Sequence, residues 1–236
     1  MSMKHILVFL FLMFPIFFLA QTINQLDDNG KRHGVWKKHF DNTNIVRYEG
    51  QFNHGKEIGL FKFYKNINKE AVLTATKQFN KTDNITEVTF FASNGKVISK
   101  GMMNGKNYIG EWTYFHKDSK EIMTLEHYNN KGQLEGESLV YYNSGQLAEK
   151  RIYKANKLQG KAIWFDESGK KMKEYNYVNG QLHGEATFYN AKGTLEIEGQ
   201  YKNDRKDGVW KYYKNGELIE EKDFTRYSKN PYLKKD

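Results

Sequence analysis

The 236-residue chain contains no cysteine and only two prolines, Pro15 and Pro231. Without cysteine the chain has no disulfides, no thiolate metal ligands and no cysteine nucleophile. The shortage of proline permits long strands, because proline removes a ladder hydrogen bond inside a sheet. Together these absences exclude a collagen-like chain, a proline-rich linker protein and a small disulfide scaffold.

The one long apolar run lies at the start of the chain. It extends over 14 residues, from Ile6 to Leu19, and is followed by Ala20 and polar sequence. This layout is typical of a secretory signal peptide, and the run is short for a membrane span, which needs about 20 apolar residues. We therefore expect a signal peptide over residues 1–20 and an exported protein that is periplasmic, bound to the cell envelope or secreted. A retained N-terminal anchor is the alternative, because Phe18 stands where a small residue is usual.

Basic residues outnumber acidic ones. The chain has 37 Lys and Arg against 28 Asp and Glu, a net charge of +9, and removal of residues 1–20 would leave +8. Such a charge favours acidic partners, namely phospholipid headgroups, anionic polysaccharide or an acidic protein, and export argues against nucleic acid. We interpret the lysines of the turns and of the tail as solubilising charges that also deter pairing at an open sheet edge. Contact with an anionic membrane surface is the alternative.

A short motif recurs eight times at intervals of 24 to 27 residues, which is typical of repeat architectures. Each unit begins at an anchor position, occupied by glycine in seven units and by Thr86 in the third. The anchor glycines are Gly34, Gly59, Gly110, Gly136, Gly160, Gly184 and Gly208. We therefore divide the chain into a signal peptide (1–20), a lead-in (21–33), a repeat domain (34–224) and a basic tail (225–236).

Within a unit the apolar residues alternate. Positions +2 and +4 after the anchor are mostly aromatic or apolar, and they include four tryptophans, Trp36, Trp112, Trp164 and Trp210. Residues two apart share a face of a strand. A turn that glycine often closes follows, then a second alternating stretch, then a longer polar turn to the next anchor. Each unit is thus a predicted β-hairpin, with the anchor glycine at the turn into the first strand, and no helix is predicted after the leader.

Eight hairpins that pair edge to edge predict an all-β fold, an elongated single-layer antiparallel sheet. The motif G-x-W-x-x-[YF], followed by a glycine-closed turn, resembles MORN repeats. It is most similar to the bacterial MORN-variant repeat of exported proteins and of antitoxins from toxin–antitoxin systems. The resemblance covers about 190 of the 236 residues. It implies an elongated antiparallel sheet with a binding or scaffolding role and no catalytic residue.

The aromatic rows are the candidate contact surfaces. We interpret positions +2 and +4 as the apolar face of a sheet without a second layer, with stacking of sugars or bases as the alternative. Position +5 should point to the opposite face, where its aromatic residues form a candidate contact row or cover an interface between two copies of the protein. The residues of this row are Phe115, Tyr141, Phe165, Tyr189 and Tyr213.

No pattern of catalytic or metal-binding residues stands out. The chain has no His-Glu-x-x-His, Gly-x-Ser-x-Gly or phosphate-loop motif. Glu111, Glu137 and Glu185 recur at one repeat position, which is typical of a solvated strand residue rather than of a glycosidase acid pair. We therefore expect no enzyme, no cofactor and no metal. The favoured function is an exported protein-binding or scaffolding module, with an antitoxin-like role as one case, and the alternative is a binder of an anionic membrane surface or anionic polymer.

Overall fold

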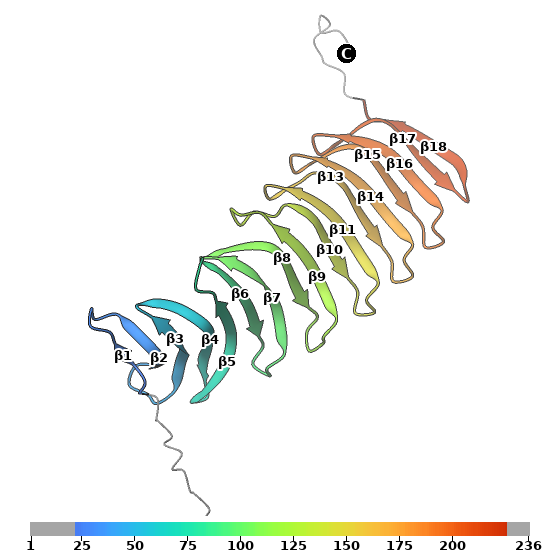
Figure 1. Cartoon of the computed structure of the whole chain (residues 1–236). Coiled ribbons are helices and arrows are strands. Elements are labelled where there is room, and N and C mark those ends of the chain that lie inside the picture. The colour runs from blue at the N-terminus through green and yellow to red at the C-terminus, as the bar shows by residue number, and fades with distance from the viewer. Residues whose placement is uncertain (1–21, 226–236) are drawn as a thin grey trace, which may run out of the picture.

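The computed structural model describes residues 22–225, so the predicted signal peptide and most of the predicted basic tail lie outside the described range. Within that range the chain forms strands and turns and no helix. Eighteen strands make one sheet (Figure 1). They are β1 (Gln25–Leu26), β2 (Arg32–His39), β3 (Val46–Asn53), β4 (Lys56–Ile67), β5 (Glu70–Phe79), β6 (Ile85–Phe91), β7 (Val97–Asn104), β8 (Asn107–Phe115), β9 (Ile122–Tyr128), β10 (Gly136–Tyr141), β11 (Leu147–Lys154), β12 (Lys157–Leu158), β13 (Gly160–Phe165), β14 (Lys171–Val178), β15 (Gln181–Tyr189), β16 (Leu195–Lys202), β17 (Arg205–Lys214) and β18 (Glu217–Asp223).

The strands follow one another through the sheet in chain order, and every pairing is antiparallel. β1 pairs with β2, and β11 pairs with both β12 and β13, which are two pieces of one strand interrupted at Gln159. The sheet is elongated and open, and its strands run across the long axis (Figure 1). The predicted single-layer antiparallel sheet of hairpins is confirmed.

The turns within the units are often closed by glycine, as predicted. Gly145 has a φ of +82°, and its N–H donates to the carbonyl of Tyr142 at 2.9 Å.

Most turns between units are shorter than predicted. They are two-residue turns such as Asn179–Gly180 and Asn203–Asp204, in which both residues have positive φ, the signature of a type I′ hairpin. The prediction of a longer polar turn was wrong for these, because the polar residues beside them belong to the strands. It is confirmed at residues 80–84 and 129–135, which connect β5 to β6 and β9 to β10.

Most anchor glycines lie inside strands and not at the turn into the first strand, which was the expectation; Gly136 and Gly160 do begin their strands, β10 and β13. Gly110 has a φ of +63° and lies in a bulge, where Gly101 pairs with Trp112 but the next residue, Met102, pairs with Ile109. Glycine adopts positive φ without the steric penalty that a Cβ brings. The unit that lacks the glycine has no bulge at this position, because the pairing of β5 with β6 keeps one register down to Thr86.

The core lies on one face of the sheet, which we call the aromatic face, and it is built from position +2. Phe61, Trp112 and Trp210 are 2%, 0% and 1% exposed. Neighbouring rings provide the cover that a second layer would give: Tyr108 stacks on Trp112 with centroids 3.8 Å apart, and Tyr201 meets Trp210 edge-on at 5.1 Å. Trp112 and Trp210 are therefore buried by aromatic residues of their own and adjacent strands.

Residues that oppose position +2 are matched to it in size. Gly50, Gly101 and Gly199 each lie under a large ring, and a Cβ at any of them would come within 2.5 Å of that ring. Where position +2 is small the opposing residue is large, as in the pair Tyr175–Ala186. These glycines were not among the predicted structural positions, although each stands nine residues before an anchor.

Candidate binding surfaces

Of the four tryptophans at positions +2 and +4, two are buried in the core and two are partly accessible. Trp112 and Trp210 are buried, and their indole N–H groups donate to backbone carbonyls at 2.9 and 3.1 Å. Trp36 and Trp164 are only half-buried. Lys173 Nζ lies 4.6 Å from the Trp164 ring centroid, a cation–π contact. Part of the aromatic face is thus core, and part is available to a ligand.

The predicted contact row at position +5 is half-buried along its whole length. Strand alternation places it on the opposite face, which we call the polar face. The hydroxyl of Tyr213 donates to Glu198 Oε1 at 2.7 Å, and the amines of Lys100 and Lys171 lie 5.9 and 5.7 Å from the rings of Phe115 and Tyr189. The row is therefore a series of aromatic rings bordered by charged side chains.

Each residue of the row pairs with the first or second residue of the next strand, and this partner is apolar in most units. The pairs are Phe115–Ile122, Tyr141–Leu147, Phe165–Lys171, Tyr189–Leu195 and Tyr213–Leu218, and the same geometry adds Tyr64–Leu73 and Phe91–Val97. We call these seven pairs the +5 stripe. Tyr64, Phe91 and the partner residues were not predicted as part of this row. A signal was present, since most partners stand two residues after a turn-closing glycine.

The surface beside the +5 stripe is hollowed next to Phe115. A groove of about 510 Å³ lies there, lined by Phe115, its neighbour Val97 and the polar residues of two turns. Phe115 is only half-buried, so part of its ring remains open to a partner at this groove.

Ion pairs occupy the rest of the polar face. Glu49 accepts a hydrogen bond from the Tyr64 hydroxyl at 2.8 Å and lies 3.3 Å from Lys37 Nζ and 3.7 Å from Lys62 Nζ. The hydrogen bond from Tyr64 and the two ammonium groups lower the pKa of Glu49, against the opposing effect of burial. Burial, together with the bond to Glu49, raises the pKa of Tyr64 to about 12. This carboxylate stays ionised and paired, as expected of a structural residue.

The carboxylates that were weighed as an acid pair have separate partners. Glu111 lies 3.5 Å from His127, and Glu137 forms an ion pair with Lys150. Over residues 22–225 no group of three or more His, Asp and Glu side chains could hold a metal ion. The same part of the chain has no helix that is long and apolar enough to cross a membrane.

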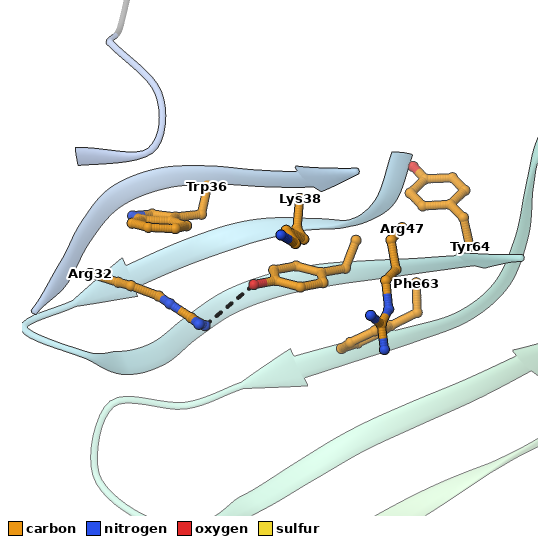
Figure 2. Close-up of a pocket in the computed structure, with 7 residues that line it drawn as sticks. Arg32, Trp36, Lys38, Arg47, Phe63 and Tyr64 are labelled. Atoms are coloured by element: carbon orange, nitrogen blue, oxygen red, sulfur yellow. Dashed lines mark hydrogen bonds between the residues drawn. The ribbon is translucent and has the colours of Figure 1, made fainter. Parts of the chain in front are cut away.

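An open groove of about 620 Å³ lies at the N-terminal end of the aromatic face, across β2, β3 and β4 (Figure 2). Arg32 reaches across it and donates to the Tyr48 hydroxyl at 3.3 Å. The lining residues on the aromatic face are Arg32, Trp36, Lys38, Arg47, Tyr48 and Phe63, and Tyr64 of the +5 stripe borders the hollow at one end (Figure 2). We call this surface the N-terminal groove. Its side chains are cationic or aromatic, and no carboxylate is among them.

The comparison with known protein families agrees with the repeat architecture. The MORN repeat variant matches residues 134–155, 158–179 and 182–203. No curated protein matches the chain. Among solved structures the chain is similar to a mutant of S. aureus TarM at 17% identity and a TM-score of 0.19, with 53% of this chain and 19% of that chain covered. Residues 134–203, which span strands β10 to β16 of the sheet, thus contain three consecutive repeats of the MORN variant type.

Proposed function

We propose that the protein is an exported, non-enzymatic module that binds another protein through the +5 stripe. The stripe is the observation that carries this proposal. It presents aromatic and aliphatic side chains from seven successive units on one face of a rigid, hydrogen-bonded sheet. Aromatic residues with a charged border are typical of the centre and rim of protein interfaces.

The repeat type supports this proposal. MORN repeats are generally protein- or membrane-binding modules. The apolar leader supports export, and the bacterial, antitoxin-like subtype names one kind of partner, a toxic protein that the module neutralises. In that case loss of this protein should harm a cell only when the toxic partner is also present.

The test is an affinity capture with the full chain from the envelope and secreted fractions of the native cell. Capture is run at physiological salt and at several-fold higher salt, and bound proteins are identified by mass spectrometry. Phe165→Ser with Tyr189→Ser removes the centre of the +5 stripe. Val178→Ser is the matched control, because Val178 is an exposed apolar residue at the opposite end of β14.

We expect one protein to survive both salt conditions, to be lost with the stripe variant and to be retained with Val178→Ser. Circular dichroism checks that both variants fold. Equal retention by the stripe variant would contradict binding through the stripe, and capture of no protein would contradict the proposed function. Capture of lipid or anionic polymer alone, lost at high salt, would favour the alternative that charge dominates.

A further inference from the structure

The N-terminal groove departs from the repeat in a way that concentrates positive charge. Position +4 is apolar or aromatic in the seven later units, but in the first unit it is Lys38. The second strand of each unit has one extra residue at a bulge, without a partner on the first strand. In the first unit this residue is Arg47, and in no other unit is it a cation. Arg32 completes the set from the start of β2. Three cations thus converge in one groove on a face that is otherwise aromatic (Figure 2).

Flat rings lie between these cations. Trp36, Tyr48 and Phe63 come from three successive strands, and the centroids of Tyr48 and Phe63 are 6.3 Å apart. All three rings are half-buried, so each is held by its neighbours and keeps part of its surface exposed. The guanidinium carbon of Arg32 lies 5.1 Å from the Trp36 ring centroid. The groove therefore combines half-exposed rings with positive charge on one surface.

The cations of the groove are weakly compensated within the described part of the chain. Arg32 and Arg47 form no ion pair with a carboxylate there, and Lys38 lies 4.0 Å from the exposed Asp41, the limit of an ion pair. Elsewhere on this face Arg151 is paired with the buried Glu149. A guanidinium has five N–H donors, and the bond to Tyr48 uses one of Arg32's. The unused donors point to an anionic ligand.

We propose that the N-terminal groove binds an acidic oligosaccharide, a chain of sugar rings that carry carboxylate or sulfate groups. Sugar rings would lie against Trp36, Tyr48 and Phe63, and the anionic groups would accept charge-assisted hydrogen bonds from the two arginines and the lysine. The volume of about 620 Å³ is within the range of small-ligand sites, and the open ends let a longer chain continue along the sheet.

The chemistry of the lining favours this class over a peptide. Arginine, lysine and indole side chains only donate hydrogen bonds, and the side-chain acceptors of the lining are two tyrosine hydroxyls, those of Tyr48 and Tyr64. The Tyr48 hydroxyl already accepts from Arg32, so most backbone N–H groups of a bound peptide that lost water would gain no partner, which is costly. An acidic sugar chain is rich in acceptors, namely ring and bridging oxygens, hydroxyls and anionic groups, so its hydrogen-bonding capacity matches that of the groove.

Isothermal titration of the full chain tests the proposal. The probes are an oligogalacturonate, its methyl ester, which keeps the rings but removes the charge, and a heparin tetrasaccharide. The groove variant is Arg32→Gln, Lys38→Gln and Arg47→Gln. The matched control is Lys173→Gln, Lys206→Gln and Lys222→Gln, which removes three cations that lie over rings of this face outside the groove. Thermal unfolding checks that both variants are folded.

We expect at least one acidic sugar to bind and the methyl ester to fail. The groove variant should bind at least about tenfold more weakly, while the control changes affinity by less than about threefold, because scattered exposed charges contribute little. The proposal is overturned if neither acidic sugar binds, if the methyl ester binds equally well, or if the control loses as much affinity as the groove variant. Vesicles of phosphatidylglycerol and a single-stranded oligothymidylate serve as further probes. If the vesicles or the oligonucleotide bound through Arg32, Lys38 and Arg47 while both acidic sugars failed to bind, the proposal would be overturned, and the groove would be a site for lipid or for nucleic acid.

Discussion

At the scale of the residue, the aromatic face is organised by pairs of large and small side chains. Trp112 can lie flat on the sheet only because the residue opposite it is Gly101, whose missing Cβ leaves room for the indole. The same relation holds for Gly199 under Trp210 and is reversed at Tyr175 and Ala186. Burial of a tryptophan in a single-layer sheet thus depends on a glycine of the adjacent strand as much as on the ring itself.

This relation predicts that Gly101→Ala destabilises the protein. The new Cβ would lie 2.5 Å from the Trp112 ring, and overpacking of this kind costs about 1–3 kcal/mol. The sign of the change in unfolding free energy is informative. Glycine weakens the interior of a strand, so without the ring its replacement by alanine would be favourable. The measurement is the midpoint of urea unfolding.

The control is to make Gly101→Ala in a protein that already carries Trp112→Ala. Trp112→Ala should itself cost about 3–5 kcal/mol, as for other large-to-small changes in a core. Once the ring is gone, Gly101→Ala should be neutral or stabilising. If Gly101→Ala cost the same free energy in both backgrounds, contact with the ring would not be the cause.

At the scale of the element, the hairpin and its glycine-closed turn could be predicted from the sequence, because alternation and turn chemistry are local signals. The position of the anchor glycine could not. A lone glycine with polar neighbours looks alike in a turn and in a bulge, and only the partner strand shows the register shift around Gly110. The seven pairs of the +5 stripe and the N-terminal groove were likewise not predicted, since both depend on which residues meet across strands.

The bulge at the anchor glycine predicts effects of substitution that differ from those the repeat pattern alone suggests. Gly110→Ala should destabilise the protein by about 1–2 kcal/mol, because an L-residue at a φ of +63° brings its Cβ close to the backbone. The pattern alone suggests that Thr86→Gly would restore a missing anchor and stabilise the third unit. The structure indicates the opposite, since Thr86 is in a regular, unbulged strand where glycine costs about 0.5–1 kcal/mol relative to alanine.

Urea unfolding of the two single variants distinguishes these views. Loss of stability in both is the expected result. A stabilised Thr86→Gly protein would show that the third unit prefers the bulged register of its neighbours, contrary to the pairing of β5 with β6.

At the scale of the whole molecule, each unit is held mainly by the units on either side of it. Stability in such an array is the sum of the units and of their interfaces, so a terminal unit with one neighbour is the least stable. Every residue of β18 is exposed, and no strand among the described residues pairs with its outer edge. The middle of the sheet differs, because Val88, Met103 and Trp112 form a buried cluster there.

Amide hydrogen exchange should therefore form a gradient along the sheet. We expect amides of β18 to be less protected than hydrogen-bonded amides of β7 and β8 by at least about a hundredfold, which is about 2.7 kcal/mol in opening free energy.

Trp112→Ala is the internal control. Protection should fall in β6 to β9, which carry the buried cluster, and change little in β17 and β18, which share no interface with it. Equal protection of all strands, lost together in the variant, would instead mean that the sheet opens as one cooperative unit. A gradient matters for function, since the +5 stripe spans units of different stability and a partner that contacts several of them would bind most rigidly at the middle of the sheet.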